Sequence, residues 1–493
     1  MITDNWTKEN LVYDDNWTKL YQGNCLDILR TLPENNINCV MTSPPYFRQR
    51  NYLTPPIIFG GDINCKHIFV SSSKYWDNRH ASVLATSETD TLGSTKDFRS
   101  KLVSEICSVC SAYKGHLGLE ETVEQFISHL VCIFREVRRV LRDDGVCFVN
   151  IGNSYNGSGG SGGDYNEGGR REGQPKVLGI SDNTIKPLNL LGIPWRFAFA
   201  MQSDGWYLRS EIIWHKRNSM PESLHGWRWE KCRIKISKQA EHTVNHFQHL
   251  SEYRGHGSDI NVHMTDGDDK YKDCPGCSTC LPNNGLVLLR GNWRPTKNHE
   301  QIFMFTKTDN YFCDLEAVKD KGSNMRTVFT TSLEPSYTSY NTNEHYAKYP
   351  LELCRKPILA ATSDYGHCGI CGRPYVRITE RESPPQSVYT NTNRIGDPYL
   401  HTLGGSKSTG AGGKLMEWRN EHPTKTMGWK ETCTCKDTIV SPGMVLDPFV
   451  GSGTTCVVAK QLSRRSIGIE LSPKYIKLAI KRVNGISLPL KDL

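Results

Sequence analysis

The sequence predicts an α/β fold in which helices cover a central sheet and polar, cysteine-bearing insertions interrupt it. Two observations point to the sheet. Apolar strands at residues 37–42 and 444–447 alternate with amphipathic helical segments, and the second strand leads into a glycine turn that opens a helix, as in a βαβ unit. A third observation points to the insertions, because many of the 18 cysteines stand in closely spaced groups within polar stretches.

Length and composition restrict the class of protein. A chain of 493 residues can build one large domain or two to three ordinary ones. The net charge of +8 suits a polyanionic partner. The N-terminus is polar and no apolar run reaches about 18 residues, so we expect neither a secretory signal nor a membrane span. These features predict a cytoplasmic protein with reduced cysteines.

The N-terminal part carries the first strands of the sheet. Residues 18–47 predict a strand, a short helix and a second strand, Ile37 to Thr42, which runs directly into Ser43-Pro44-Pro45-Tyr46. Open α/β sheets bind ligands at the carboxyl ends of their strands. The tetrapeptide is therefore a candidate site.

The rest of the chain alternates sheet segments with polar stretches. Within residues 121–152 we expect a helix that Asp144-Gly145 ends, followed by a strand. The other sheet segments are predicted at 194–214, 301–305 and 443–484. Between the sheet segments stand a glycine- and serine-rich loop at 156–173, a basic and aromatic region after 217, and a polar insertion at about 362–440.

A cofactor loop is predicted between residues 444 and 470. Glycines in the turn let a ligand approach the backbone, and an acid after the second strand can bind ribose hydroxyls. A nicotinamide cofactor uses a similar unit, but the third glycine of its fingerprint is missing. The predicted cofactor-binding residues of the loop are Asp447, Pro448, Phe449, Gly451, Gly453, Thr454, Thr455 and Glu470.

The tetrapeptide suits chemistry on the exocyclic amino group of a nucleobase. Such a group is a poor nucleophile because its lone pair is delocalised into the ring. The Ser43 hydroxyl and the Pro44 carbonyl can accept its hydrogens, and Tyr46 can stack on the base. A base reaches such a pocket only after leaving the duplex. Chemistry at carbon 5 of cytosine needs a cysteine, usually after proline, and no proline here precedes one.

Three groups of cysteine and histidine have the spacing of structural zinc sites. Full coordination leaves no open position, so none is expected to be catalytic. The middle group needs a fourth ligand, for which Cys232 is the nearest candidate and His256 or His263 are alternatives. The predicted ligands are Cys65, His67, Cys107 and Cys110; Cys232, Cys274, Cys277 and Cys280; and Cys368, Cys371, Cys433 and Cys435.

The region between residues 217 and 294 interleaves basic and aromatic side chains. Basic groups neutralise phosphates, and arginine can also bind guanine edges. The predicted DNA-binding residues are Arg217, Arg228, Arg233 and Arg294, with aromatic neighbours at Trp227, Trp229, Tyr253 and Trp293.

Together these motifs resemble the β-group DNA amino-methyltransferases, in which the catalytic motif comes first, the recognition region follows and the cofactor motif is last. The likeness extends to residues 192–196, 205–209, 213–216 and 298–300, and is closest to phage and prophage modification enzymes. It implies a circularly permuted Rossmann-like sheet that binds S-adenosylmethionine. It also implies direct methyl transfer to a base amino group of double-stranded DNA, with Ser43, Pro44, Pro45 and Tyr46 as catalytic residues.

The resemblance implies further cofactor contacts and a target base. Gly23-Asn24-Cys25 stands where the family has Gly-Asp-Cys, so Asn24 and Cys25 are expected at the cofactor. For the methionine end we favour residues 345–350, with His345 and Pro350, over the similar residues 422–425. Ser-Pro-Pro-Tyr is commoner in cytosine-N4 enzymes, which we favour, and Asp-Pro-Pro-Tyr in adenine-N6 enzymes, the alternative.

The expected organisation follows from these assignments. Candidate partners are double-stranded DNA, a second copy of the chain and a cognate restriction nuclease, in the cytoplasm of a bacterial or phage-infected cell. Two other hypotheses stay open: a zinc-ribbon nucleic-acid-binding protein with a vestigial methyltransferase fold, and an RNA or protein amide substrate.

The expected units are a catalytic half at 1–216 with a zinc insertion at about 60–118, a target-recognition insertion at 217–297, a return to the methyltransferase domain at 298–361, a zinc-ribbon-like insertion at 362–440 and a cofactor-binding half at 441–493.

Overall fold

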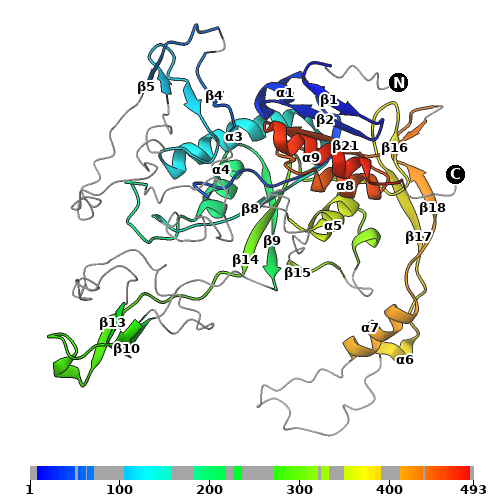
Figure 1. Cartoon of the computed structure of the whole chain (residues 1–493). Helices are drawn as coiled ribbons and strands as arrows, with labels where there is room; N and C mark the ends of the chain where they lie inside the picture. Colours follow the sequence, from blue (N-terminus) through cyan, green and yellow to red (C-terminus); the bar gives the residue numbers. More distant parts are fainter. Residues whose placement is uncertain are drawn as a thin grey trace.

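The computed structural model contains one large mixed sheet, with strands in the order β1-β2-β21-β20-β3-β8-β14-β9-β15 (Figure 1). The structure describes residues 8–49, 54–62, 64–71, 105–157, 182–217, 226–235, 271–319, 324–331, 349–389, 411–436 and 439–488. In sheet order, the strands are β1 (Leu11–Asp14), β2 (Thr18–Gln22), β21 (Arg465–Glu470), β20 (Met444–Asp447), β3 (Ile37–Thr42), β8 (Leu141–Ile151), β14 (His299–Thr306), β9 (Tyr207–Lys216) and β15 (Val328–Thr331).

Both ends of the chain build the centre of this sheet. The C-terminal strands β20 and β21 are inserted between the N-terminal strands β2 and β3, and β2, β21, β20, β3 and β8 are all parallel. The strand β14 is antiparallel to both of its neighbours, β8 and β9. The carboxyl ends of β20, β3 and β8 therefore lie at one edge of the sheet. The mixed α/β sheet expected from the sequence is confirmed.

Helices cover both faces of the sheet. The first face packs against α1 (Cys25–Thr31), α3 (Val123–Val140) and α4 (Ile193–Ser203), and the second against α5 (Leu351–Ala361) and α8 (Thr454–Gln461). The final helix, α9 (Pro473–Asn484), packs on α8 and β2.

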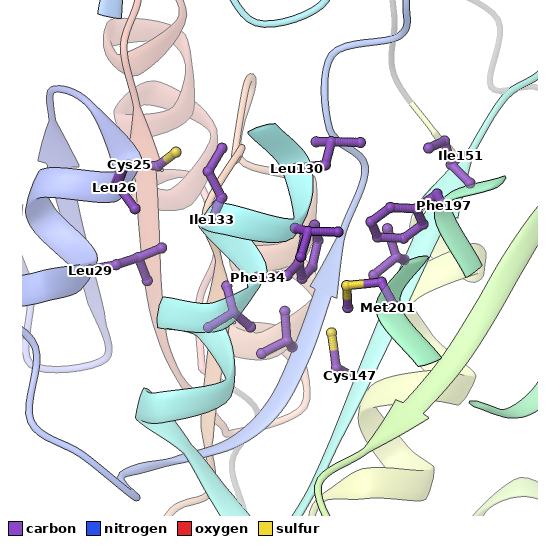
Figure 2. Close-up of a cluster of buried hydrophobic side chains, with 14 of the residues drawn as sticks. Cys25, Leu26, Leu29, Leu130, Ile133, Phe134, Cys147, Ile151, Phe197 and Met201 are labelled. Atoms are coloured by element: carbon purple, nitrogen blue, oxygen red, sulfur yellow. The ribbon is translucent and has the colours of Figure 1, made fainter. Parts of the chain in front are cut away.

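The alternation along β3 explains why this strand is apolar throughout. Val40 joins the core of the first face, whereas Cys39 and Met41 join the core of the second, and none of the three is exposed. Successive side chains of a strand point to opposite faces, so a strand covered on both sides needs an apolar residue at every position. Figure 2 shows the first-face core, in which Phe134 and Phe197 lie between the helices and β8.

The helix α3 ends earlier than the sequence suggested. It stops at Val140, and the next residue, Leu141, has extended backbone angles and already pairs with Ile37 of β3. Asp144 and Gly145, expected to end the helix, therefore fall inside β8. The register between β3 and β8 shifts near this point, so the chain makes an irregular entry into the sheet that turn-forming residues can occupy.

No described helix is long and apolar enough to cross a membrane.

Small separate sheets occupy the three predicted insertions. The small sheets are β4 (Ile57–Phe59), β7 (Tyr113–Gly115), β6 (Glu105–Cys107) and β5 (Phe69–Ser71); β10 (Trp227–Lys231) with β13 (Leu286–Arg290); β11 (Arg233–Lys235) with β12 (Tyr271–Asp273); β16 (His367–Cys368) with β19 (Val440–Ser441); and β17 (Tyr375–Glu380) with β18 (Lys425–Glu431). The insertions also contain η4 (Leu281–Asn283), α6 (Gln386–Tyr389) and α7 (Ala411–Glu421), and η5 (Glu316–Val318) precedes β15.

Candidate active site

The two predicted motifs meet at the carboxyl edge of the sheet. The tetrapeptide Ser43 to Tyr46 follows β3, and the glycine turn follows the neighbouring strand β20. Thr42, the last residue of β3, donates a hydrogen bond of 2.6 Å to the Asp447 carboxylate, at the end of β20. Pro44 is buried, while Ser43 and Tyr46 are half-buried. Two segments from opposite ends of the chain are thus joined directly at the candidate site.

The Asp447 carboxylate lies at the centre of this junction. It is fully buried and accepts hydrogen bonds from the hydroxyls of Thr42 and Thr455, both at 2.6 Å, from the Tyr349 hydroxyl at 3.0 Å and from the Phe449 N–H at 3.0 Å. Burial raises the pKa of Asp447, although these hydrogen bonds oppose the shift. Since four protein groups already surround this carboxylate, it fixes the geometry of the site.

The turn after β20 has the backbone conformation expected of a ligand cradle. Gly451 and Gly453 have φ angles of 52° and 84°, in the left-handed region that favours glycine. A Cβ on Gly453 would stand only 3.0 Å from the Cβ of Ala479 on α9. Arg482 donates to the carbonyl and hydroxyl of Ser452, each at 2.8 Å, and holds the turn against α9.

Glu470 lies at the end of β21, beside the glycine turn. Its two carboxylate oxygens accept from the Gly451 N–H at 2.9 Å and from the Ser472 N–H at 2.7 Å. Burial raises the pKa of this carboxyl to about 7, against the lowering effect of the two N–H groups. Glu470 therefore changes charge near neutral pH.

The remaining predicted cofactor residues are placed unequally. Asn24 caps α1 through a bond from the Leu26 N–H, whereas the Cys25 side chain is packed in the apolar core, where burial raises the pKa of its thiol to about 12. Pro350 is the N-cap residue of α5 and is buried, and His345 lies outside the described residues.

Tyr349, which belongs to the favoured 345–350 segment but was not singled out within it, joins the cofactor turn. Its hydroxyl lies 2.5 Å from the Thr455 hydroxyl and 3.0 Å from Asp447. The segment 349–350 thus adjoins the turn, whereas the alternative segment 422–425 lies at the end of α7 and the start of β18, within the 362–440 insertion. The position of Tyr349 before Pro350 in the favoured segment was the available sequence signal.

A polar network around Tyr46 was also not predicted. The Tyr46 hydroxyl donates to the Glu300 carboxylate at 2.6 Å and accepts from the Asn150 side-chain amide at 2.8 Å. Lys216 forms an ion pair with Glu300. Burial acts to raise the pKa of Glu300, yet the Lys216 charge and the hydrogen bonds from Lys216, Tyr46 and Asn150 outweigh it and hold that pKa below its usual value. Lys216 and Glu300 stand in segments that carry the family resemblance, which was the only sequence signal for them.

The three cysteine groups each bring four ligand atoms together. In every group these atoms lie within 4.8 Å of one another, and Cys232 completes the middle group. The Cys277 and Cys280 sulfurs are 3.5 Å apart and the Cys232 and Cys277 sulfurs 4.0 Å apart. Zinc–sulfur bonds of about 2.3 Å place sulfurs about 3.8 Å apart in a tetrahedron. The spacing and the all-thiolate or thiolate–imidazole donor sets suit zinc.

The predicted recognition residues are spread over several elements. Arg217 directly follows β9 of the large sheet, whereas Arg228 lies on β10, which pairs with β13 and extends away from the large sheet (Figure 1). Arg233 lies on β11, and Tyr253 lies outside the described residues. Trp227 and Trp293 are 70% and 74% exposed, an unusual degree for tryptophan. Arg217 and Arg233 are exposed, but Arg228 forms an ion pair with Glu230. The Arg294 guanidinium lies 3.7 Å from the centre of the Tyr155 ring, so this residue packs against the segment that follows β8.

Comparison with known proteins identifies the family. A family model described as DNA methylase matches residues 37–368 and 434–481. The chain is similar to the type II methyltransferases M.Cfr9I of Citrobacter freundii (26% identity, covering 95% of this chain and 89% of that protein) and M.SmaI of Serratia marcescens (27% identity, 75% and 77%). Among solved structures it matches the PvuII DNA methyltransferase (cytosine-N4-specific) at 14% identity and a TM-score of 0.42, over 97% of this chain and 92% of that one. Because the family model covers well over half of the chain, this protein belongs to the DNA methylase family, and the DNA amino-methyltransferase predicted from its two motifs is confirmed.

Proposed function

We propose that the protein transfers a methyl group from S-adenosylmethionine to the N4 amino group of cytosine in double-stranded DNA, at a specific sequence. The observation that carries this proposal is the hydrogen bond between Thr42 and Asp447, because it places the Ser43 to Tyr46 tetrapeptide beside the glycine turn. A base held by the first motif and a methyl donor held by the second could then react directly, without a covalent enzyme intermediate.

The residues around the turn fit the proposed cofactor. Gly451 and Gly453 give the turn left-handed backbone angles that favour glycine, and the Glu470 carboxylate at the end of β21 can accept from ribose hydroxyls. Asn24 and Pro350 are proposed to complete the pocket. When bound, S-adenosylmethionine supplies an electrophilic methyl group. The order of strands, with β20 and β21 last in the chain but central in the sheet, supports a circularly permuted Rossmann-like fold.

The tetrapeptide would activate the amino group. The Ser43 hydroxyl and the Pro44 carbonyl accept its hydrogens, which favours a pyramidal nitrogen with an available lone pair. That lone pair could then accept the methyl group that bound S-adenosylmethionine would supply, with the sulfur as leaving group, and the nitrogen would release a proton to solvent. Tyr46 would stack on a base that has flipped out of the duplex. Serine at the first position favours cytosine N4, with adenine N6 as the alternative.

The insertions would recognise DNA and hold zinc. We assign one structural zinc ion to each cysteine group, since each supplies four ligand atoms at suitable spacing. The exposed Trp227 and Trp293, with Arg217 and Arg233, would contact the duplex. The unit boundaries given above, a restriction–modification role and a cognate nuclease belong to the same proposal.

Nucleoside analysis tests this function. Purified protein and labelled S-adenosylmethionine are incubated with mixed genomic DNA, which is then digested and analysed by mass spectrometry, with Ser43→Ala as the control. N4-methylcytosine is the expected product. N6-methyladenine would retain the mechanism and correct the base, whereas no methylated base with cofactor binding intact would contradict a DNA substrate.

A further inference from the structure

The ion pair between Lys216 and Glu300 lies at the root of the recognition segment, residues 217–297. Lys216 is the last residue of β9, which leads into this segment, and Glu300 is the second residue of β14, which leads out of it. The two strands pair here, and the Lys216 N–H donates to the Asn298 carbonyl at 2.8 Å. The side chains of Lys216 and Glu300 are only 21% and 12% exposed. The pair therefore joins the entry and exit of the segment in a largely buried position.

The same carboxylate determines how Tyr46 is hydrogen-bonded. One Glu300 oxygen binds Lys216, and the other accepts from the Tyr46 hydroxyl at 2.6 Å and from the Asn150 amide at 3.0 Å. A tyrosine hydroxyl has a single hydrogen. Since that hydrogen goes to Glu300, the Tyr46 oxygen can only accept from its other partners, which are Asn150 at 2.8 Å and Ser43 at 3.4 Å.

This direction matters at Ser43. When the Ser43 hydroxyl donates its hydrogen to Tyr46, its lone pairs are left to accept a hydrogen from an incoming amino group. Reversing the bond would present a hydroxyl hydrogen to the base instead. A carboxylate at position 300 prevents the reversal, because an ionised carboxylate only accepts hydrogen bonds.

Packing also fixes the Tyr46 ring, in addition to the hydrogen bonds of its hydroxyl. A Cβ on Gly152 would stand 2.4 Å from the Tyr46 ring, so the ring packs directly over this glycine. The exit from the recognition segment also contacts this neighbourhood, because Lys297 donates to the Asn153 carbonyl at 2.8 Å. The recognition segment and the tetrapeptide thus share one packed, hydrogen-bonded boundary.

We propose that Glu300 and Lys216 are positioning residues that hold the Tyr46 ring and the Ser43 hydroxyl in the orientation needed to accept a flipped base, and that they connect this orientation to the root of the recognition segment. The inference rests on the proposed function of Ser43 and Tyr46. It adds two residues that do not touch the base but control the two that do.

Replacing the carboxylate tests the proposal. In Glu300→Gln the acceptor carboxylate becomes an amide that can also donate, so we expect the single-turnover rate on duplex DNA to fall about 100-fold, as for a small misplacement of reacting groups. The KM for S-adenosylmethionine should change less than about threefold. Glu211→Gln, the same substitution on the neighbouring strand β9, is the matched control and should keep the wild-type rate. Equal rates for wild type and Glu300→Gln would overturn the proposal.

A double-mutant cycle separates positioning from general damage. Lys216→Met alone leaves the Glu300 carboxylate partly buried without its cation, so it should also lower the rate. If the pair acts as a unit, Lys216→Met combined with Glu300→Gln should be no slower than the slower single variant. Rate losses that multiply in the double variant would contradict the shared role.

A readout independent of methylation distinguishes this inference from the proposed function. With 3-fluorotyrosine at position 46, wild-type protein should give one narrow ¹⁹F resonance, and Glu300→Gln should shift or broaden it because the hydroxyl anchor changes. An unchanged resonance would contradict positioning even if DNA is methylated. A changed resonance in a protein that methylates no DNA would support positioning and refute the proposed function instead.

Discussion

The centre of the large sheet and the small sheets of the insertions are stabilised by different means. In β3, Cys39, Val40 and Met41 are completely buried between two helical layers. In β17, by contrast, Val376 and Ile378 are 42% and 47% exposed. Apolar burial contributes about 25 cal/mol per Å², so the central strands contribute strongly to folding while these β17 side chains contribute little. The cysteine groups lie in or beside the small sheets, so the proposed zinc ions would contribute to stability there.

Metal removal should have the largest effect, and the unfolding it causes should be confined to the insertions. Structural zinc contributes about 10–16 kcal/mol of binding free energy in small zinc modules. We expect three zinc ions per chain by elemental analysis, one for each four-ligand group. Cys371→Ser should lose one of them and expose residues 362–440 to proteolysis, while the large sheet stays folded.

The position of each zinc site sharpens this prediction. The third group leads through β19 directly into β20, and Arg142 of β8 donates to the Cys371 carbonyl at 3.0 Å. Cys371→Ser should therefore also weaken S-adenosylmethionine binding. Cys277→Ser is the matched control, since its group lies in the recognition segment, and it should weaken DNA binding alone. Protein purified without zinc and with all three insertions resistant to protease would refute the assignment.

A cavity created in the core by mutation should have the next largest effect, and it should destabilise the large sheet. Phe134 of α3 is fully buried and packs edge-on against Phe197 of α4, with ring centres 5.3 Å apart. Phe134→Ala should reduce the free energy of unfolding by about 3–5 kcal/mol, measured by urea denaturation of the zinc-loaded protein. Ile378→Ala, at a half-exposed position of β17, should change it by less than about 1 kcal/mol. Similar losses in both variants would mean that the small sheets have a core of their own.

The same contrast explains what the sequence could predict. The strands β3 and β20 were predictable because burial on two faces requires continuous apolar runs. The grouping of the cysteines was predictable because close spacing in the chain is a local signal, and the Cys232 sulfur does lie with the sulfurs of the middle group. The end of α3 was not predictable, because pairing of Leu141 with Ile37 in the sheet overrides the turn signal of Asp144 and Gly145.

Residues that act through distant partners were the hardest to predict. Glu300 reaches Tyr46, 254 positions away, only because β14 pairs with β8 in the sheet. No local pattern marks such a contact. The motif residues at strand ends were predictable, whereas the buried Asn150 and the partly buried Lys216 and Glu300 that surround them became visible only through the tertiary structure.

The smallest predicted effect is a pH dependence of cofactor binding, which arises at the carboxyl edge of the large sheet and not in the insertions. The raised pKa of Glu470, about 7, means that the folded protein without cofactor favours the protonated carboxyl. This group's contribution to stability is therefore present below its unfolded pKa of about 4.3 and lost as pH rises through about 7.

Ribose hydroxyls would bind the ionised carboxylate of Glu470, so affinity for S-adenosylmethionine should rise over the same pH range. We expect the Kd at pH 6 to be about tenfold higher than at pH 8, measured by calorimetry. Glu470→Gln should bind more weakly with little pH dependence, because its amide does not titrate. A wild-type Kd that stays constant between pH 6 and 8 would place the ribose away from Glu470 and leave the carboxylate only its two contacts with the Gly451 and Ser472 N–H groups.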